Sequence, residues 1–544
     1  MASPNIPAAK RAGLPVDLDR LTAEGDSWLT PEDRYALKTH GVCTQKQDGR
    51  FMVRLRIPGG VLPAEQLRGI ARLARTYGSD WVHLTTRQNI ELHWVEATKV
   101  QALLVALGRI GISTRSSCGH TLRNVMCSED AGLGLDEPFD CMPDAAAVSA
   151  AIVARSVELN VTLPARLNFS FGGSPRCEED ARLNDAGFVS RVRDGVAGYE
   201  LWAGGGLGKA PALSVQLSDF VPRTEVLAAA EGLIDVFISH GNIDTPTKGR
   251  MKFVVERLGE AGFRAAWDQA FAEHRRKDHP APAEVEVLAD VDRIAVLQEL
   301  PPGGWSAGVR PQRTPRLALV TIDVPMGDSN CSELELLADL AERYGDGHLT
   351  LGRDQDVVLR NVPIPNVVAI RNAVAPRGLF LLGEAHVARV RACTGSSVCA
   401  LGITEAPQAG TTLLESPGLG RNSSLRVHVS GCPNSCAQHQ AGDIGLAGSK
   451  VRINGTTRDG YHLFLGADVG AGVVGEIVGR VAAEHVPAAV EAVVGTWEAV
   501  RHGNEQLART VARIGHDAFA AHIAAAMADR WASVPEPDLV TAAD

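Results

Sequence analysis

The chain has 544 residues, of which 45% are hydrophobic and 22% charged, and its formal net charge is −10. This length is too great for one hydrophobic core, so two to four domains are expected. The negative charge argues against a nucleic-acid partner, and without an apolar run of bilayer length we expect no membrane partner. The first residues lack an apolar signal region and 10 cysteines are too few for a disulfide scaffold, so the sequence predicts a cytoplasmic location.

Strand and helix patterns alternate through the first part of the chain. Residues 52–57 alternate like a strand that has Arg54 and Arg56 on one face, and the glycine-rich residues 58–60 predict a turn. Helical spacing follows at 67–77 and 100–108, and residues 82–85 and 90–94 predict strands.

The same order of elements returns later in the chain. Pro58, Tyr77, Arg87 and Cys127 each have a counterpart 266 or 267 residues further on, at Pro325, Tyr344, Arg353 and Cys393. A second block, around residues 163–199, matches 424–461 at slightly smaller offsets. Linker-like stretches at 278–283 and 301–308 bracket the junction. The fold class we predict is therefore α/β (α+β), built on a duplicated unit.

Four cysteines in the second copy have a metal-binding pattern. Cys393 and Cys399 are separated by five residues, and Cys432 and Cys436 by three. Converging thiolates suit zinc or an iron–sulfur cluster, and the wide first gap favours the larger object. Pro433 predicts a first helical turn that would put Cys436 on the same face as Cys432. The alternative is four ordinary buried thiols.

Arginines mark the first copy instead. Arg54, Arg87, Arg123 and Arg166 lie at predicted strand ends or beside turns, in apolar surroundings. Buried guanidiniums need anions to balance them, which predicts acidic groups of a cofactor or a small anionic substrate. The alternative is that each of these arginines, Arg56 and Arg87 above all, pairs with a local carboxylate.

Together these residues resemble the siroheme- and [4Fe-4S]-dependent nitrite and sulfite reductases of the ferredoxin-type, assimilatory kind. The resemblance covers about residues 33 to 480. It is carried by the cysteine pattern, by Gly49–Gly60, by Leu84–Ile90, by Arg123-Asn124-Val125 and by Leu163-Pro164. It implies a duplicated reductase repeat with pseudo-two-fold symmetry and siroheme at the interface of the halves.

The resemblance also implies how the chain divides. The expected segments are an N-terminal extension (1–32), a ferredoxin-like half-domain (33–145), a siroheme and substrate domain (146–280), a linker (281–312), a second ferredoxin-like half-domain (313–392), a [4Fe-4S] and siroheme domain (393–500) and a C-terminal helical tail (501–544).

Site residues follow from the same resemblance. It implies that Cys393, Cys399, Cys432 and Cys436 bind the cluster, and that Cys436 also bridges to the siroheme iron. Arg54, Arg123, Arg166 and Asn168 would surround the substrate. The cofactor contacts it implies are Arg87, Gln88, Asn89, Arg391, Arg426, Asn434 and Cys436.

The expected activity is the six-electron reduction of nitrite to ammonium. Where the family has Arg-Lys after Leu-Pro, this chain has Ala165-Arg166, and an arginine cannot lend a proton as a lysine can. Asn168 resembles the nitrite members, since sulfite members tend to have a lysine there. With no nucleotide-binding fingerprint, the electrons are expected from a separate protein such as ferredoxin. Basic runs at 248–252 and 274–277 are candidate docking sites for it, and the favoured alternative is that both runs are solvated surface.

Three other interpretations stay open. The first is an assimilatory sulfite reductase that forms sulfide. The second is a precorrin-3B synthase-like oxygenase, which keeps a cluster but no siroheme. The third is a zinc-stabilised binding protein without a redox role.

Overall fold

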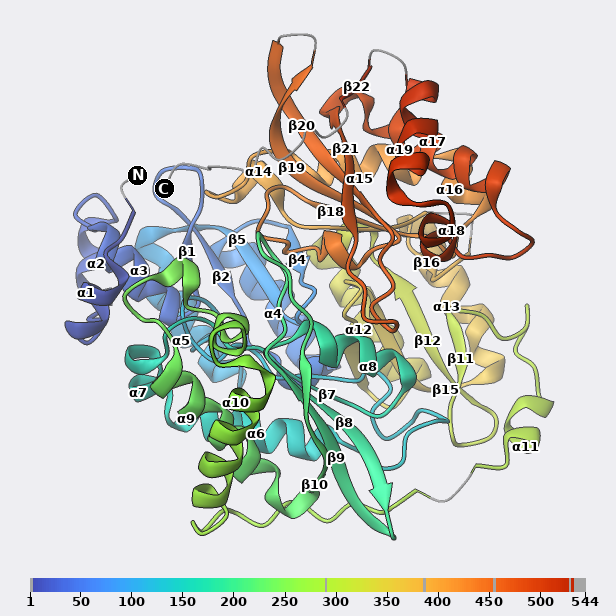
Figure 1. The fold of residues 1–544 in the computed structure, drawn as a ribbon. Helices are drawn as coiled ribbons and strands as arrows, with labels where there is room; N and C mark the ends of the chain where they lie inside the picture. Colours follow the sequence, from blue (N-terminus) through green and yellow to red (C-terminus); the bar gives the residue numbers. More distant parts are fainter. Residues whose placement is uncertain (1–2, 289–290, 385–387, 454–455, 528–529, 533–544) are drawn as a thin grey trace. The chain divides into compact units, whose positions relative to one another are not determined.

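The computed structural model describes residues 3–288, 291–384, 388–453, 456–527 and 530–532 (Figure 1). The chain forms two compact units, one of residues 1–206 and 212–382, the other of residues 207–211 and 383–544. The finer seven-segment division of the chain stays a prediction.

The first ferredoxin-like half is an antiparallel sheet in the order β1-β2-β5-β4-β13. Its strands are β1 (Val42–Thr44), β2 (Arg50–Arg54), β4 (Val82–Leu84), β5 (Ile90–Glu96) and β13 (Asp328–Ser329). Helices α4 (Ala64–Tyr77) and α5 (Val100–Arg109) bury apolar faces in the same core. The strands and helices predicted between residues 52 and 108 are confirmed, although β2 ends before Arg56.

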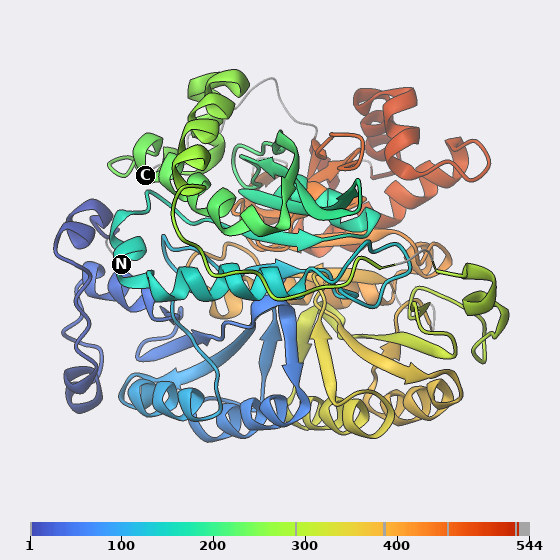
Figure 2. The same ribbon diagram turned by 90° about the horizontal axis from the view of Figure 1, so that it is seen from below.

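The second half repeats this design. Its sheet has the order β11-β12-β15-β14-β3, and β16 also pairs with β12. The elements are β3 (Val61–Pro63), β11 (Val309–Pro311), β12 (Leu317–Asp323), β14 (His348–Leu351), β15 (Val357–Pro363), β16 (Phe380–Leu381), α12 (Cys331–Tyr344) and α13 (Val367–Val374). Figure 2 shows the two sheets, blue and yellow, side by side with helices across one face of each.

The two halves exchange edge strands. β3 of the first copy pairs with β14 of the second, and β13 of the second pairs with β4 of the first. Two equivalent glutamines reinforce the exchange. The amide of Gln88 donates to the carbonyls of Cys127 and Leu351 at 2.9 Å each, and that of Gln355 donates to the carbonyl of Leu84 at 2.8 Å. One hydrophobic core therefore runs through both halves.

The rest of the first unit is a mixed sheet with helices. Its strand order is β10-β9-β8-β7-β6, with parallel pairing between β6, β7 and β8 only. The strands are β6 (Met126–Cys127), β7 (Phe169–Gly172), β8 (Ala186–Arg193), β9 (Val196–Ala203) and β10 (Val215–Pro222). The helices are α6 (Met142–Ala154), α7 (Ser156–Thr162), α8 (Pro175–Leu183), α9 (Val226–His240), α10 (Met251–His274) and α11 (Arg293–Gln298).

The second unit has the same mixed topology. β17, β18 and β19 are parallel neighbours, and β19, β20, β21 and β22 continue the sheet antiparallel. The strands are β17 (Arg389–Ala392), β18 (Arg426–Ser430), β19 (Ile444–Ile453), β20 (Thr456–Leu465), β21 (Glu476–Ala482) and β22 (Trp531–Ala532). The helices are α14 (Gly395–Val398), α15 (Ala406–Leu414), α16 (Pro417–Arg421), α17 (Val486–Val500), α18 (Leu507–Ile514) and α19 (His516–Met527). Helices α18 and α19 lie in the C-terminal segment, 501–544, that is expected from the sequence to be helical.

Three short helices, α1 (Ile6–Arg11), α2 (Leu18–Glu24) and α3 (Pro31–Thr39), form the N-terminal region. A buried lysine fastens α1, because the ammonium of Lys10 donates to the carbonyls of Asn160 and Leu163 near the end of α7. Among the described helices, none is by itself long and apolar enough to span a membrane; α6 and α7 reach that length only as a pair bent by 76°.

Replacing Gln88 by alanine tests the junction of the halves. The substitution removes the acceptor of the Cys127 N–H, which donates to the Gln88 side-chain oxygen. It also removes the donor to the carbonyls of Cys127 and Leu351. Each unsatisfied buried group costs about 1–3 kcal/mol, so the free energy of unfolding should fall by about 3 kcal/mol or more in denaturant titrations. The exposed Gln269→Ala in α10 is the control and should change it by about 0.5 kcal/mol or less. Equal losses in the two variants would contradict this role.

Candidate functional site

The four cysteines gather at one edge of the sheet in the second unit. β17 leads into Cys393 and β18 leads into Gly431 and Cys432, and these two strands are parallel neighbours. The carboxyl ends of parallel strands meet at the same edge of a sheet. The N–H of Cys393 accordingly donates to the carbonyl of Val429 at 3.1 Å, and the N–H of Gly431 donates to the Cys393 sulfur at 3.1 Å.

Glycines let the cysteine loops pack closely. Gly395 has φ +57°, and a Cβ there would lie 2.5 Å from the Ala406 nitrogen. A Cβ on Gly431 would lie 2.8 Å from the Gly395 Cα. The two loops therefore hold their cysteines in place through direct backbone contact.

The thiols act on one another electrostatically. Burial, followed by the neighbouring Cys436 and Cys399, raises the pKa of Cys432 to about 12. Burial and then Cys436 also raise the pKa of Cys393 above its usual value. A thiol with a raised pKa resists ionisation unless a nearby cation compensates the negative charge of the thiolate. A bound metal centre supplies such a cation. The structure thus brings the four predicted ligands together.

The helix expected after Cys432 is wrong. Residues 432–438 form turns, because Ser435 and Gln438 adopt left-handed backbone conformations with φ +58° and +59°. These turns leave Cys436 exposed although Cys432 is buried.

Arg54, in the first unit, is neutralised within the protein. It faces Glu91 across the β2–β5 pair, and its Nε donates to the Glu91 carboxylate at 2.9 Å. The Arg54 guanidinium and the neighbouring His93, whose Nε2 lies 3.3 Å from Glu91 Oε2, hold the pKa of Glu91 well below its usual range, against the burial of the carboxyl. Arg54 therefore has a local carboxylate partner, as the alternative interpretation of the arginines expects, and its charge does not need an outside anion. Sequence reasoning missed Glu91, although a carboxylate between Ile90 and Leu92 was a signal.

Arg123 has no such carboxylate among its described hydrogen bonds. Its guanidinium donates to the carbonyls of Ser117 and Gly119 at 2.8–3.1 Å. Burial, together with the charges of Arg87 and Arg54, lowers its pKa to about 9. Of the arginines expected to meet an anion, Arg123 fits that role best.

Arg56 does not pair with a local carboxylate in the described structure. It is buried, and it donates to the Leu122 carbonyl at 3.0 Å and to the Ser149 hydroxyl at 3.1 Å. The pairing considered for it in the sequence is wrong, because β2 ends at Arg54 and Arg56 turns towards α6.

Asn168 lies just before β7 and is fixed by Asp185. Its backbone N–H and its side-chain amide both donate to one Asp185 oxygen at 2.9 Å, and Arg250 holds the same carboxylate at 3.0–3.2 Å. This orientation leaves the buried Asn168 side-chain oxygen without a partner. The neighbouring Arg166 is half-buried.

Lys252 is buried near this group, so neither the docking interpretation nor the solvated-surface alternative holds for this residue. It belongs to the run 248–252 expected to dock a partner, but it donates to the Gly206 carbonyl at 3.1 Å, and Arg250 is bound to Asp185. Burial, then Arg250, lowers the pKa of Lys252 to about 8.

The residues expected to contact the cofactor differ in burial and in the partners that they already have. Gln88 is fully buried and its amide serves the backbone at the junction of the halves, which argues against a cofactor contact. Asn89 is buried with an unpartnered side-chain nitrogen. In the second unit, the Arg391 guanidinium donates a hydrogen bond to the Gln438 side-chain oxygen. Arg426 forms an ion pair with Asp443 at 3.3 Å. Asn434 is exposed, and Arg87 is half-buried.

Replacing Glu91 by glutamine should leave the Arg54 guanidinium buried without its counter-charge. We expect the free energy of unfolding to fall by about 3 kcal/mol at pH 7. The native pKa of Glu91 is depressed, so its contribution is present above the unfolded value of about 4.3 and fades as the pH falls below it. Denaturant titrations should therefore give a constant difference between pH 7 and pH 5.

Glu96, which is half-buried at the end of the same strand, gives the matched control. It pairs with Arg50 at 2.9 Å, and Glu96→Gln should cost about 1 kcal/mol or less. If Glu91→Gln lowers the free energy of unfolding no more than Glu96→Gln does, the pairing of Arg54 with Glu91 does not stabilise the protein.

Two family models match this chain, each of them twice. The nitrite/sulfite reductase ferredoxin-like half domain matches residues 44–110 and 310–377. The nitrite and sulphite reductase 4Fe-4S domain matches residues 118–275 and 383–530. The duplication predicted from the sequence is thereby confirmed.

Individual relatives agree with the family models. The chain is 30% identical to a ferredoxin–nitrite reductase of Synechococcus elongatus, over 81% of this chain and 85% of that one. It is 29% identical to a ferredoxin sulfite reductase of Mycolicibacterium paratuberculosis, over 77% and 74%. The solved structure of the Mycobacterium tuberculosis NirA protein has the same fold, with a TM-score of 0.80 at 24% identity over 95% of this chain and 98% of that one. The chain therefore belongs to the nitrite and sulfite reductase family.

Proposed function

We propose that this chain reduces nitrite to ammonium with electrons from ferredoxin. Its family consists of oxidoreductases that use siroheme and a [4Fe-4S] cluster. The observation that supports the proposal most is the group of four cysteines at the ends of β17 and β18.

The donor set fits an iron–sulfur cluster. Burial raises the pKa of the Cys393 and Cys432 thiols, and the backbone N–H of Gly431 already donates to the Cys393 sulfur. We propose Cys393, Cys399, Cys432 and Cys436 as its ligands. N–H···S bonds of this kind tune the potential of a cluster.

For siroheme we propose Cys436 as the shared thiolate and Arg87, Asn89, Arg391, Arg426 and Asn434 as contacts. Cys436 is exposed, as a thiolate shared with a second group must be. When bound, siroheme supplies an iron centre that takes up the anion and delivers electrons to it. The arginines suit the acidic side chains of the macrocycle, because guanidiniums pair with carboxylates in bidentate geometry.

We propose Arg54, Arg123, Arg166 and Asn168 as the residues around the substrate. The charge of Arg54 is already balanced by Glu91. Arg123 differs, because its described hydrogen bonds all go to backbone carbonyls. The negative charge that moves to the departing oxygens is stabilised by such fixed guanidiniums.

Asn168 favours nitrite over sulfite. Asp185 holds its amide nitrogen, so that it presents an oxygen and no positive charge. Sulfite carries more negative charge than nitrite and gains more from a lysine at this position.

Lys252 is the group we propose for supplying protons in place of the missing lysine. Arg166 stays charged at any working pH, whereas Lys252 has a pKa lowered to about 8 and is electrostatically coupled to Arg166. An amine with this pKa is protonated at pH 7 and can release its proton during turnover.

The electron donor and the cellular location are also proposals, and two alternative functions can be tested by experiment. Ferredoxin is the expected donor, and the cytoplasm stays the predicted location because free thiols persist in a reducing compartment. A visible spectrum with a strong Soret band would separate this enzyme from a precorrin-3B synthase-like oxygenase, which lacks siroheme. Zinc without iron would instead support the binding-protein interpretation.

Substrate preference is tested with reduced methyl viologen as the donor. The purified enzyme should show a higher kcat/KM for nitrite than for sulfite. Asn168→Lys should move this ratio towards sulfite by about tenfold, because it adds a positive charge beside the anion. A wild-type enzyme that prefers sulfite would establish the runner-up function, sulfite reduction, instead.

Cys436→Ser tests the shared thiolate. We expect the variant to lose cluster iron, the siroheme absorption and nitrite turnover, because serine is a poor ligand for both centres. Cys331→Ser in α12 is the control, since Cys331 lies in the ferredoxin-like half and should leave iron content and colour unchanged. Unchanged colour, iron and turnover in Cys436→Ser would remove the basis of the proposal.

A further inference from the structure

Glu231, His274 and His279 form a compact group outside the proposed redox site. Within the described part of the chain, it is the one group of three or more His, Cys, Asp or Glu whose ligand atoms all lie within 4.8 Å of one another. Glu231 lies in α9, His274 ends α10 and His279 follows in the segment after that helix. In the sequence, residues 274–277 stand out as a basic run and a candidate docking site for ferredoxin.

His274 is buried between two carboxylates. Its Nε2 lies 2.6 Å from Asp235 Oδ2, and its Nδ1 lies 3.0 Å from Glu231 Oε2. A metal-bound histidine usually donates its other ring N–H to a carboxylate, which fixes the tautomer. With Asp235 accepting the Nε2 proton, Nδ1 carries the free lone pair, and this atom lies 3.0 Å from Glu231 Oε2.

His279 shows the same pattern. Its Nε2 lies 3.0 Å from the backbone carbonyl of His274, and since a carbonyl only accepts, Nε2 carries the proton. The ligand role then falls to Nδ1. Both imidazoles therefore have their outer N–H satisfied before any ion binds.

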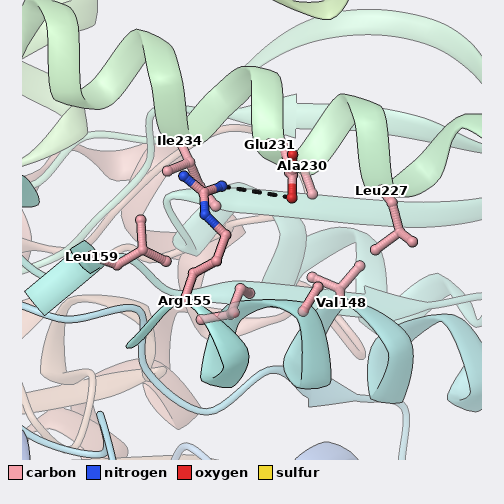
Figure 3. Close-up of a pocket in the computed structure, with 9 residues that line it drawn as sticks. Val148, Arg155, Leu159, Leu227, Ala230, Glu231 and Ile234 are labelled. Carbon is pink, nitrogen blue, oxygen red and sulfur yellow. Dashed lines mark ion pairs between the residues drawn. The ribbon is translucent and has the colours of Figure 1, made fainter. Parts of the chain in front are cut away.

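Glu231 is positioned from its other side by Arg155. Figure 3 shows the Arg155 side chain reaching Glu231 across a pocket lined by α6, α7 and α9. The Arg155 Nη1 lies 3.6 Å from Glu231 Oε1, while Glu231 Oε2 lies 3.0 Å from His274 Nδ1. The two carboxylate oxygens thus have separate partners.

Lys277 is the competing cation. Its ammonium lies 3.3 Å from Nδ1 and 3.4 Å from Nε2 of His274. Lys277 is exposed and its side chain is long, so a divalent ion can displace it at small cost.

We propose that Glu231, His274 and His279 bind a zinc ion, with Asp235 and the His274 carbonyl orienting the two imidazoles. Two imidazoles and a carboxylate are a zinc ligand set, with Zn–N and Zn–O distances of about 2.0–2.2 Å. The ion would fasten α9 to the end of α10, where the chain leaves the first copy of the repeat.

The test uses the holoenzyme, so that its iron centre already occupies the cysteines. After dialysis against buffered micromolar Zn²⁺, elemental analysis should find about one zinc per chain, and zinc X-ray absorption should show nitrogen and oxygen ligands at about 2.0–2.1 Å. Zinc bound by sulfur at about 2.3 Å, or no bound zinc, would overturn the proposal.

Three variants sharpen the test. His279→Ala should weaken zinc binding by about tenfold or more without changing iron content or the visible spectrum. Lys277→Met should tighten it, because the competing ammonium is gone. His240→Ala, at the exposed end of α9, is the control and should bind zinc as the wild type does. Equal zinc affinity in wild type and His279→Ala would also overturn the site.

Discussion

The parallel pairing of β17 with β18 is the constraint on which the proposed redox centre depends. It sets Cys393 and Gly431 side by side, and the Gly431 N–H contacts the Cys393 sulfur. The remaining two cysteines follow within a few residues, so their positions are limited by short loops rather than by distant parts of the fold. A metal centre that needs four thiolates is thus assembled mostly from two strand ends.

The equivalent edge in the first copy shows why only one copy keeps this chemistry. β6 and β7 are also parallel, and Cys127 lies where Cys393 lies in the second copy. There, however, the Cys127 sulfur packs 3.5 Å from that of Cys141, and a Cβ on Gly172 would come within 2.4 Å of the Cys177 sulfur. Close packing of thiols has filled the space at this edge, and the first copy contributes arginines instead.

How much could be predicted from sequence depended on whether the signal was local. The repeat was visible because equivalent residues keep an offset of 266 or 267, and the cysteine group because short spacings bring the ligands together. The partner of Arg54 could not be read in this way, since Glu91 is 37 residues away and meets it only through strand register. The turns after Cys432 were missed because proline suggested a helix, whereas Ser435 adopts a left-handed conformation. The burial of Lys252 and of His274 overrode their appearance as surface charge.

The exchange of β3 and β13 explains how the two copies could diverge without separating. Each ferredoxin-like sheet is completed by a strand of the other copy, and Gln88 and Gln355 tie the crossing points to backbone carbonyls. Neither half can satisfy its edge alone, and unpaired buried backbone groups are costly. The requirement for pairing acts on these strands and on the shared core, but not on the loops at the strand ends. Those loops were therefore free to acquire cysteines in one copy and guanidiniums in the other.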